Sequence, residues 1–264
     1  LVAAGPMLLQ QWHYLTPDAA NVLVGSLVML AVVRWERSTG SGAALVALAA
    51  AGVLAMAVKG PNVVVVVAGA LYLLIRFVLS RRGEAARSPR QYLMAAAALS
   101  GGAAVASLTW LVVRAALARD VTTPMEEAER VSGLLRPAQV LENVARFVTV
   151  WDREPSSVYP LAVITSYLFV GSLLVALAVL ARRDPRRALA MATVIVLLAG
   201  PLLLVALNFL VRDSYAIVEP RYGTTLVPVQ AAIAASLWSG RVLPAVGGLA
   251  AAATGAVLLR LLSG

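Results

Sequence analysis

The sequence predicts an all-α fold: a polytopic transmembrane helical bundle that forms one domain over residues 1–264. Hydrophobic residues make up 61% of the chain and charged residues only 13%, too few polar side chains to cover a water-soluble globule of this size. The hydrophobic residues fall into runs of about the length that a membrane-crossing helix needs. Arginines gather in short linkers after every second run, as the positive-inside rule describes.

The first apolar run, residues 1–9, is too short to cross a bilayer. Because the chain begins with Leu1 and no basic segment precedes this run, we expect the latter part of a longer protein and not a signal peptide. A polar, aromatic segment over 10–18 is typical of an interfacial loop. Eight full spans are then predicted, at residues 19–34, 42–58, 61–80, 92–115, 160–181, 188–211, 223–238 and 243–262.

The linkers predict the orientation of the bundle in its membrane. Eleven arginines lie in alternate linkers and mark the cytoplasmic side: Arg34, Arg37, Arg81, Arg82, Arg87, Arg90, Arg182, Arg183, Arg186, Arg187 and Arg241. Ten of the thirteen acids lie in the other linkers, which are therefore expected outside. Arg76, Arg114 and Arg260 lie near helix ends, and the simplest interpretation is that they extend to the headgroups.

The longest linker, residues 116–159, is predicted to be an extracytoplasmic loop that contains an amphipathic helix. Apolar residues recur there at helical spacing, at Val140, Leu141, Val144, Phe147, Val148 and Trp151. Glu142, Asn143 and Arg146 are predicted to occupy the opposite face. Such a helix lies in the membrane interface, either as a plain connector or as a cover over a substrate.

Composition excludes several classes of function. The net charge of +9 would suggest nucleic-acid binding in a soluble protein, but here the arginines flank apolar runs and no aromatic platform accompanies them. The absence of cysteine excludes disulfides and thiolate metal sites, and a single histidine leaves a histidine-based zinc site without partners. No metal site is predicted. A divalent cation held by carboxylates is the one cofactor that the composition leaves open.

Two polar clusters precede predicted spans on the outer side. Asp18 follows Pro17, where its carboxylate would either cap the helix or act as a general base toward a substrate hydroxyl. Lys59 opens the tight turn Lys59-Gly60-Pro61-Asn62. Its ammonium would either extend to the lipid headgroups or bind a phosphate, because Gly60 permits close approach and Pro61 makes the turn rigid.

The sharpest cluster places Glu219, Arg221 and Tyr222 within four residues, directly before the span at 223–238. The planar guanidinium of Arg221 suits a phosphate diester or pyrophosphate, and Tyr222 adds a hydroxyl donor or a stacking face for a sugar. The alternative is an aromatic-belt tyrosine beside an arginine bound to lipid headgroups. Pro228 is expected to kink the span. His13, in the loop 10–18, is either an interfacial packing residue or a substrate contact.

Together these motifs resemble the GT-C superfamily of membrane glycosyltransferases. The resemblance is carried by Pro17-Asp18 before a span, Lys59-Gly60-Pro61 at an outer turn, and Pro220-Arg221-Tyr222 followed by Pro228. It implies a polyprenyl-phosphate sugar donor and a glycan or lipid acceptor of the cell envelope on the extracytoplasmic side. The family's usual catalytic acid, in the first outer loop, would precede Leu1. The Ala, Val and Arg bias is similar to that of actinobacterial proteins.

The sequence therefore favours an enzyme that moves a sugar from a polyprenyl phosphate to an envelope acceptor. We expect Arg221, Lys59, Tyr222, Glu219 and His13 to bind substrate and Asp18 to be the catalytic candidate. Membrane lipids and protein subunits are the other expected partners, and nucleic acid is not. The alternative is a non-catalytic membrane protein, either a lipid or solute transporter or a structural subunit of an envelope complex.

Overall fold

The computed structural model describes residues 20–38, 41–116, 130–131, 137–149, 159–212, 215–216 and 220–238. Several sequence predictions lie outside these ranges and remain predictions: residues 1–9, His13, Asp18, Glu219 and the span at 243–262. In the described ranges the chain is all-helical apart from one pair of two-residue strands. The predicted fold class is confirmed to that extent.

The helices coincide with the predicted apolar runs. They are α2 (Asn21–Arg37), α3 (Gly42–Val58), α4 (Val63–Arg81), α5 (Pro89–Ala116), α7 (Pro137–Thr149), α8 (Tyr159–Val179), α9 (Pro185–Arg212) and α10 (Val227–Leu237). Two 3₁₀ helices, η3 (Gly60–Asn62) and η4 (Pro220–Leu226), precede α4 and α10. The strands β1 (Arg130–Val131) and β2 (Tyr215–Ala216) pair antiparallel, which the sequence did not predict.

Local sequence fixes several of the helix starts. Ser41 accepts a hydrogen bond from the backbone N–H of Ala44 at the start of α3. Asp184 accepts one from the N–H of Arg186 at 2.8 Å at the start of α9. Ser88 and Gln91 exchange hydrogen bonds at the start of α5, in a capping-box arrangement. Each cap satisfies backbone donors that a helix end leaves unpaired.

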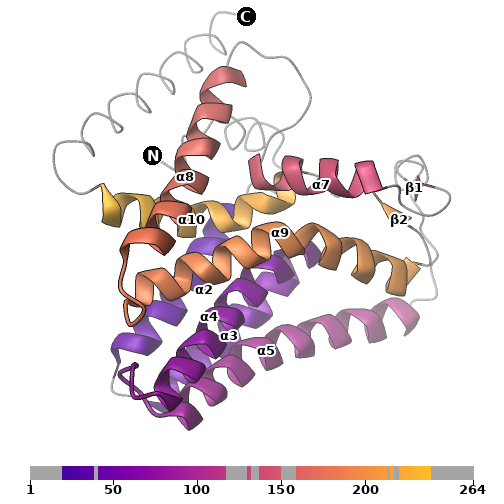
Figure 1. Ribbon diagram of the computed structural model, residues 1–264. Coiled ribbons are helices and arrows are strands. Elements are labelled where there is room, and N and C mark those ends of the chain that lie inside the picture. The colour runs from indigo at the N-terminus through magenta and orange to yellow at the C-terminus, as the bar shows by residue number, and fades with distance from the viewer. Residues whose placement is uncertain are drawn as a thin grey trace, which may run out of the picture.

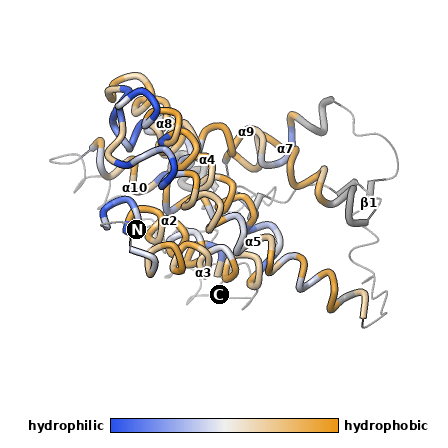
Figure 2. Tube along the Cα trace, turned by 90° about the horizontal axis from the view of Figure 1, so that it is seen from below, coloured by the Kyte–Doolittle hydropathy of each residue, from blue (hydrophilic) through white to orange (hydrophobic). Residues whose placement is uncertain are grey.

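Successive helices alternate in direction and leave two chemically different ends. Figure 1 shows α2, α3, α4, α5 and α9 lying side by side, while α8 rises steeply beside α9 and α7 lies above the second half of α9. The turns after α2, α4 and α8 meet at one end, where arginines gather, and we call this the basic end. At the other end η3 contacts η4, η4 contacts α7, and β2, which pairs with β1, lies against α9. Hydropathy along the chain shows long hydrophobic stretches within the helices and hydrophilic residues mostly at their ends (Figure 2).

Close packing between helices depends on glycines that face a neighbouring backbone. A Cβ added at Gly102 would lie 2.0 Å from the carbonyl oxygen of Ala49, and one at Gly52 would lie 2.2 Å from that of Leu99. Both contacts join α3 to α5, so these helices approach backbone to backbone, as small residues allow in membrane bundles. Around them the core buries large side chains, led by Trp35, Tyr92, Leu99, Leu73 and Leu48.

Among the described residues, three helices are long and apolar enough to cross a membrane: Gly60–Arg81, Pro89–Val113 and Pro185–Leu207. The predicted count of eight spans is not confirmed, since α2 and α3 contain 17 residues each and α10 contains 11. The second half of α5 exposes apolar side chains around its circumference, with Leu108, Trp110 and Val112 at least 60% exposed. Such a helix surface is suited to lipid and not to water.

Two details of the predicted elements are wrong. On α7, Asn143 is buried at 4% exposure and Leu141 is 71% exposed, the reverse of the predicted faces. The reason is that α7 packs on α9 and η4 through the face that carries Asn143 and Phe147, one turn apart. Pro228 does not kink a span: it lies in the first turn of α10, where its missing N–H costs nothing.

The glycine contacts lead to a test with neighbouring residues of one helix. Gly102→Ala should lower the free energy of unfolding by about 1–3 kcal/mol, because its Cβ would collide with the backbone of Ala49. Gly101→Ala is the matched control, since nothing lies within 4 Å of a Cβ at that position. Thermal unfolding of both variants in detergent measures the difference. Equal stability of the two variants would contradict the close α3–α5 contact.

Candidate functional site

The turns that the sequence places on the outer side meet at one end of the structure. The η3 turn contacts η4, α7 contacts η4, and β1 pairs with β2, so parts of the linkers at 59–62, 116–159 and 212–222 lie together. The N-terminal turns of α2 and α4 complete this group. We refer to this end as the site end.

The Lys59 turn is held rigidly between α3 and α4. The N–H of Lys59 donates to the carbonyl of Ala55, and the N–H of Asn62 donates to the carbonyl of Lys59 at 3.0 Å. The side-chain amide of Asn62, fully buried, donates to the carbonyl of Ala55 at 3.2 Å. The Oδ1 atom of Asn62 has no hydrogen-bond partner among the described residues. This buried asparagine fixes the turn that carries Lys59.

The η4 segment packs against the N-terminal part of α2. A Cβ at Gly25 would lie 2.1 Å from the carbonyl oxygen of Thr225, so only glycine allows this approach. Thr224 and Thr225 are buried against the bundle, and Leu226 is fully buried below them. This packing sets the position of the preceding Arg221-Tyr222 pair.

Lys59 and Tyr222 are in contact. They lie 163 positions apart in the sequence and are predicted to share one site. The Nζ atom of Lys59 lies 5.1 Å from the centre of the Tyr222 ring, which is within the range of a cation–π interaction. Both side chains are half-buried. The ring orients the ammonium. Arg221 directly precedes Tyr222 in η4, and its side chain lies outside the described part of the structure.

Of the predicted site residues, the structure brings the side chains of Lys59 and Tyr222 together and describes Arg221 only through its backbone in η4. Glu219, His13 and Asp18, the remaining ones, lie outside the described residues. Within the described ranges no three acidic or histidine side chains come together as the ligands of a metal ion would. The expectation of a divalent cation held by carboxylates remains a prediction.

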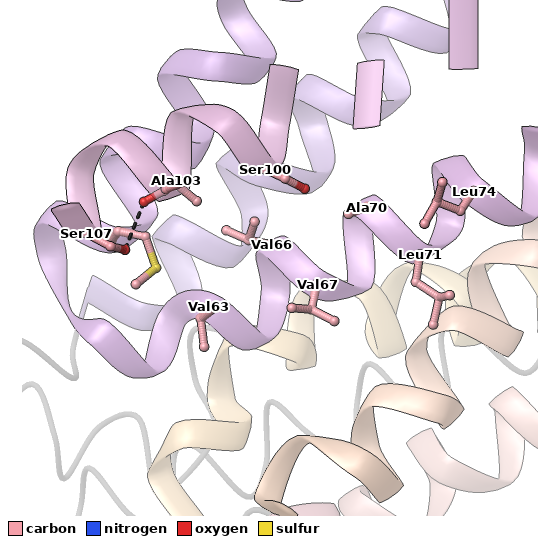
Figure 3. A pocket seen from close by; sticks show the side chains of 11 residues that line it. Val63, Val66, Val67, Ala70, Leu71, Leu74, Ser100, Ala103 and Ser107 are labelled. Atoms are coloured by element: carbon pink, nitrogen blue, oxygen red, sulfur yellow. Dashed lines mark hydrogen bonds between the residues drawn. The ribbon is translucent and has the colours of Figure 1, made fainter. Parts of the chain in front are cut away.

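An apolar groove begins beside the Lys59 turn. Met56 and Val63, which flank the turn, line its first part, and the groove continues along α4 to Leu74. Figure 3 shows Val66, Val67 and Leu71 of α4 along it, with Ser100 and Ser107 of α5 near its other wall. Its volume is about 390 Å³, and eleven residues of helix give it a length of about 16 Å.

A second polar cluster, at the basic end, was missed by sequence reasoning. Arg76 is buried at 4% exposure and pairs with Glu36 at 2.9 Å. The hydroxyls of Tyr72 and Tyr92 both donate to the Glu36 carboxylate, the latter at 3.0 Å. Arg76 also donates to the carbonyl of Arg183 at 3.1 Å. The prediction that Arg76 extends to the headgroups is wrong, because the protein supplies it with a carboxylate.

Two further arginines complete the basic end. The guanidinium of Arg87 lies 4.6 Å from the centre of the Trp35 ring and donates to the carbonyl of Trp35 at 2.7 Å. Arg186 pairs with Asp184 at 2.7 Å. This hydrogen bond holds the pKa of the Asp184 carboxyl below its ordinary value, against the opposing effect of partial burial. Asp184 is therefore an anion at neutral pH.

One signal in the sequence points to the Arg76 pair, namely the isolation of one arginine within an apolar run. Charged side chains buried in a span are costly unless they are paired, so Arg76 requires a partner. Its acceptor, Glu36, lies 40 residues away and was assigned to a linker, so its partner was not evident from spacing. The cluster links α2, α4, α5 and the turn before α9. Every oxygen of Glu36's carboxylate is engaged, which is typical of a structural clamp.

The fold and its site end define a helical protein with three helices suited to cross a membrane and a cationic, aromatic turn at one end. No protein-family model matches the chain, and no curated protein or solved structure matches it. The assignment of a function therefore depends on the geometry of the site.

The Glu36–Arg76 pair can be tested by a double-mutant cycle. Arg76→Leu and Glu36→Leu should each lower the free energy of unfolding by about 3–5 kcal/mol, because each leaves the partner charge buried and unpaired. The double variant should be more stable than the sum of the two losses predicts. Chemical or thermal unfolding in detergent measures the coupling. Additive losses would show that the two charges do not interact.

Proposed function

We propose that this protein is a membrane glycosyltransferase that takes a sugar from a polyprenyl-phosphate donor and transfers it to an extracytoplasmic envelope acceptor. The observation that carries the proposal is the contact of Lys59 with Tyr222 in η4, directly beside Arg221. It brings two of the three motifs of the GT-C resemblance into one site. About eight spans, with the basic end in the cytoplasm, complete the proposed arrangement in a bacterial plasma membrane.

The proposed chemistry follows from charge. When the bond between the sugar and the lipid phosphate breaks, negative charge develops on the phosphate, and cations fixed beside it lower the barrier. Lys59 is oriented by the Tyr222 ring, and Arg221 is the neighbour of that ring in the chain. The proton of the acceptor hydroxyl goes to a carboxylate, for which Asp18 is the candidate in this chain. Glu219 and His13 remain candidate substrate contacts.

The apolar groove supports a lipid-linked donor. It begins at Met56 and Val63 on the two sides of the Lys59 turn and continues along α4 into the apolar part of the bundle. A polyprenyl phosphate has the matching order of parts, with an anionic head followed by a long apolar tail. A transporter would be expected to carry charged residues at mid-membrane. Here the buried Glu36–Arg76 pair lies near the opposite helix ends and is fully engaged.

The head-binding residues are tested by substitution. Lys59→Ala and Arg221→Ala should each weaken binding of a polyprenyl phosphate by about ten- to a hundredfold, the contribution of a charge-assisted hydrogen bond, and should abolish sugar transfer. Binding is measured by native mass spectrometry and transfer with radiolabelled polyprenyl-phosphate sugars. Arg34→Gln, which removes a cation at the basic end, is the control. Unchanged binding and transfer in both site variants would favour a structural subunit.

The groove is tested by tail length. Ala70→Phe should fill the groove and weaken binding of a long polyprenyl phosphate, while binding of a short-chain phosphate should be unchanged, because only the long tail reaches Ala70. Ala50→Phe on the exposed face of α3 is the matched control. Titration with both lipids measures the two affinities. Equal loss for long and short tails would show that the tail does not occupy the groove.

A further inference from the structure

Arginines surround the whole basic end of the molecule. Eight of them are exposed: Arg34, Arg37, Arg81, Arg82, Arg90, Arg182, Arg183 and Arg186. They come from three different turns, those after α2, α4 and α8, and from the helix ends beside them. Their side chains form a positively charged surface, and the proposed glycosyl transfer does not say what binds there.

Contacts between the turns show that these arginines belong to one surface. Arg87, in the turn after α4, donates to the carbonyls of Trp35 and Glu36 at the end of α2. Arg76 donates to the carbonyl of Arg183 in the turn after α8, and it also pairs with Glu36. The buried Glu36–Arg76 cluster thus connects the three turns on their inner side, and the exposed arginines lie on the outer side of the same turns.

The acids at this end leave the surface strongly positive. In the described ranges three acids lie here, Glu36, Glu84 and Asp184. The charge of Glu36 is balanced by the buried Arg76, and that of Asp184 by Arg186. Only Glu84 is left among these acids to balance the exposed arginines, so an anionic partner would be attracted strongly.

Exposed apolar side chains follow the arginines along the helices, and we call them the apolar shoulder. Within about one helical turn of the arginines, Val78, Leu93, Met94, Val179 and Met191 expose their side chains, from 38% for Met191 to 67% for Val179. Because α4, α5 and α9 are suited to cross a membrane, acyl chains would lie against this shoulder and phospholipid phosphates at the level of the arginines. A soluble acidic partner would contact the arginines alone, whereas a phospholipid contacts the arginines with its phosphate and the shoulder with its acyl chains.

We propose that the basic end binds the headgroups of anionic phospholipids, with phosphates held by Arg82, Arg90 and Arg182 and acyl chains against the exposed residues of α4, α5 and α8. Guanidinium groups suit this ligand because each presents a planar fork to phosphate oxygens. A lipid that contacts all three turns would stabilise the packing of the helix ends at the surface, as the Glu36–Arg76 cluster does in the interior. The proposal does not depend on glycosyl transfer.

The experiment compares lipid retention and stability in nanodiscs. The protein should unfold at a higher temperature in nanodiscs that contain phosphatidylglycerol or cardiolipin than in nanodiscs of phosphatidylcholine alone. In the triple variant Arg82→Gln, Arg90→Gln, Arg182→Gln this difference should disappear. Native mass spectrometry should show anionic-lipid affinity reduced by about fivefold for each arginine removed.

Two further variants and two soluble probes make the outcome decisive. The triple Arg→Lys variant at the same positions keeps the charge and should retain most of the binding, whereas Arg130→Gln in β1, which removes a cation away from the basic end, should not change it. Anionic-lipid retention that survives in the triple Gln variant, or is lost in Arg130→Gln, overturns the proposal. So does equal protection by pyrophosphate, which would indicate a free-phosphate site, or stronger protection by polyglutamate, which would indicate an acidic protein partner.

Discussion

The arrangement of this molecule depends on backbone contacts that leave no room for a side chain. Gly52 and Gly102 bring α3 against α5, and Gly25 brings α2 against η4. In lipid there is little hydrophobic driving force between apolar helices, so such close approach supplies much of the attraction through packing. The same contacts set the geometry of the site, because the close contact of the Thr225 carbonyl with Gly25 fixes the position of η4, which contains Tyr222. The position of the candidate site therefore depends on the packing of small residues.

The two ends of the bundle use cations in opposite ways. At the basic end Arg76 is buried, and its charge is balanced by the Glu36 carboxylate, which two tyrosine hydroxyls also contact. Such a pair specifies which helices lie together but has little capacity to attract a ligand. At the site end Lys59 is half-buried, and its ammonium lies beside the face of the Tyr222 ring, which attracts a cation. The first arrangement suits a structural clamp, and the second positions a cation at the start of the apolar groove.

The positions of the helices could be predicted because run length and linker composition are local properties of the chain. Lys59 and Tyr222 could be predicted to share a site because alternation of spans places their turns at the same end. The rotation of α7 could not, since contact with α9 and η4 decides which face is buried and leaves Leu141 exposed and Asn143 inside. The Glu36–Arg76 pair was missed because hydropathy indicates that the Arg76 charge lies in an apolar run but does not identify the residue that pairs with it. The count of eight spans is not confirmed, and one reason is that the predicted span at 223–238 divides into η4 and the short helix α10, which pack on neighbouring elements.

The placement of charge bears on the choice between transfer and transport. A transporter needs ionisable groups that bind and release a solute within the bundle, and such groups must have unused donors or acceptors facing a cavity. Among the described residues, the buried ion pair is Glu36–Arg76, and its partners come from the protein on every side. The groove is apolar, and the residues that line its first part, Met56 and Val63, flank the turn that carries Lys59. An apolar path that begins beside a cationic turn suits a lipid with an anionic head, and chemistry on that head would take place at the membrane surface.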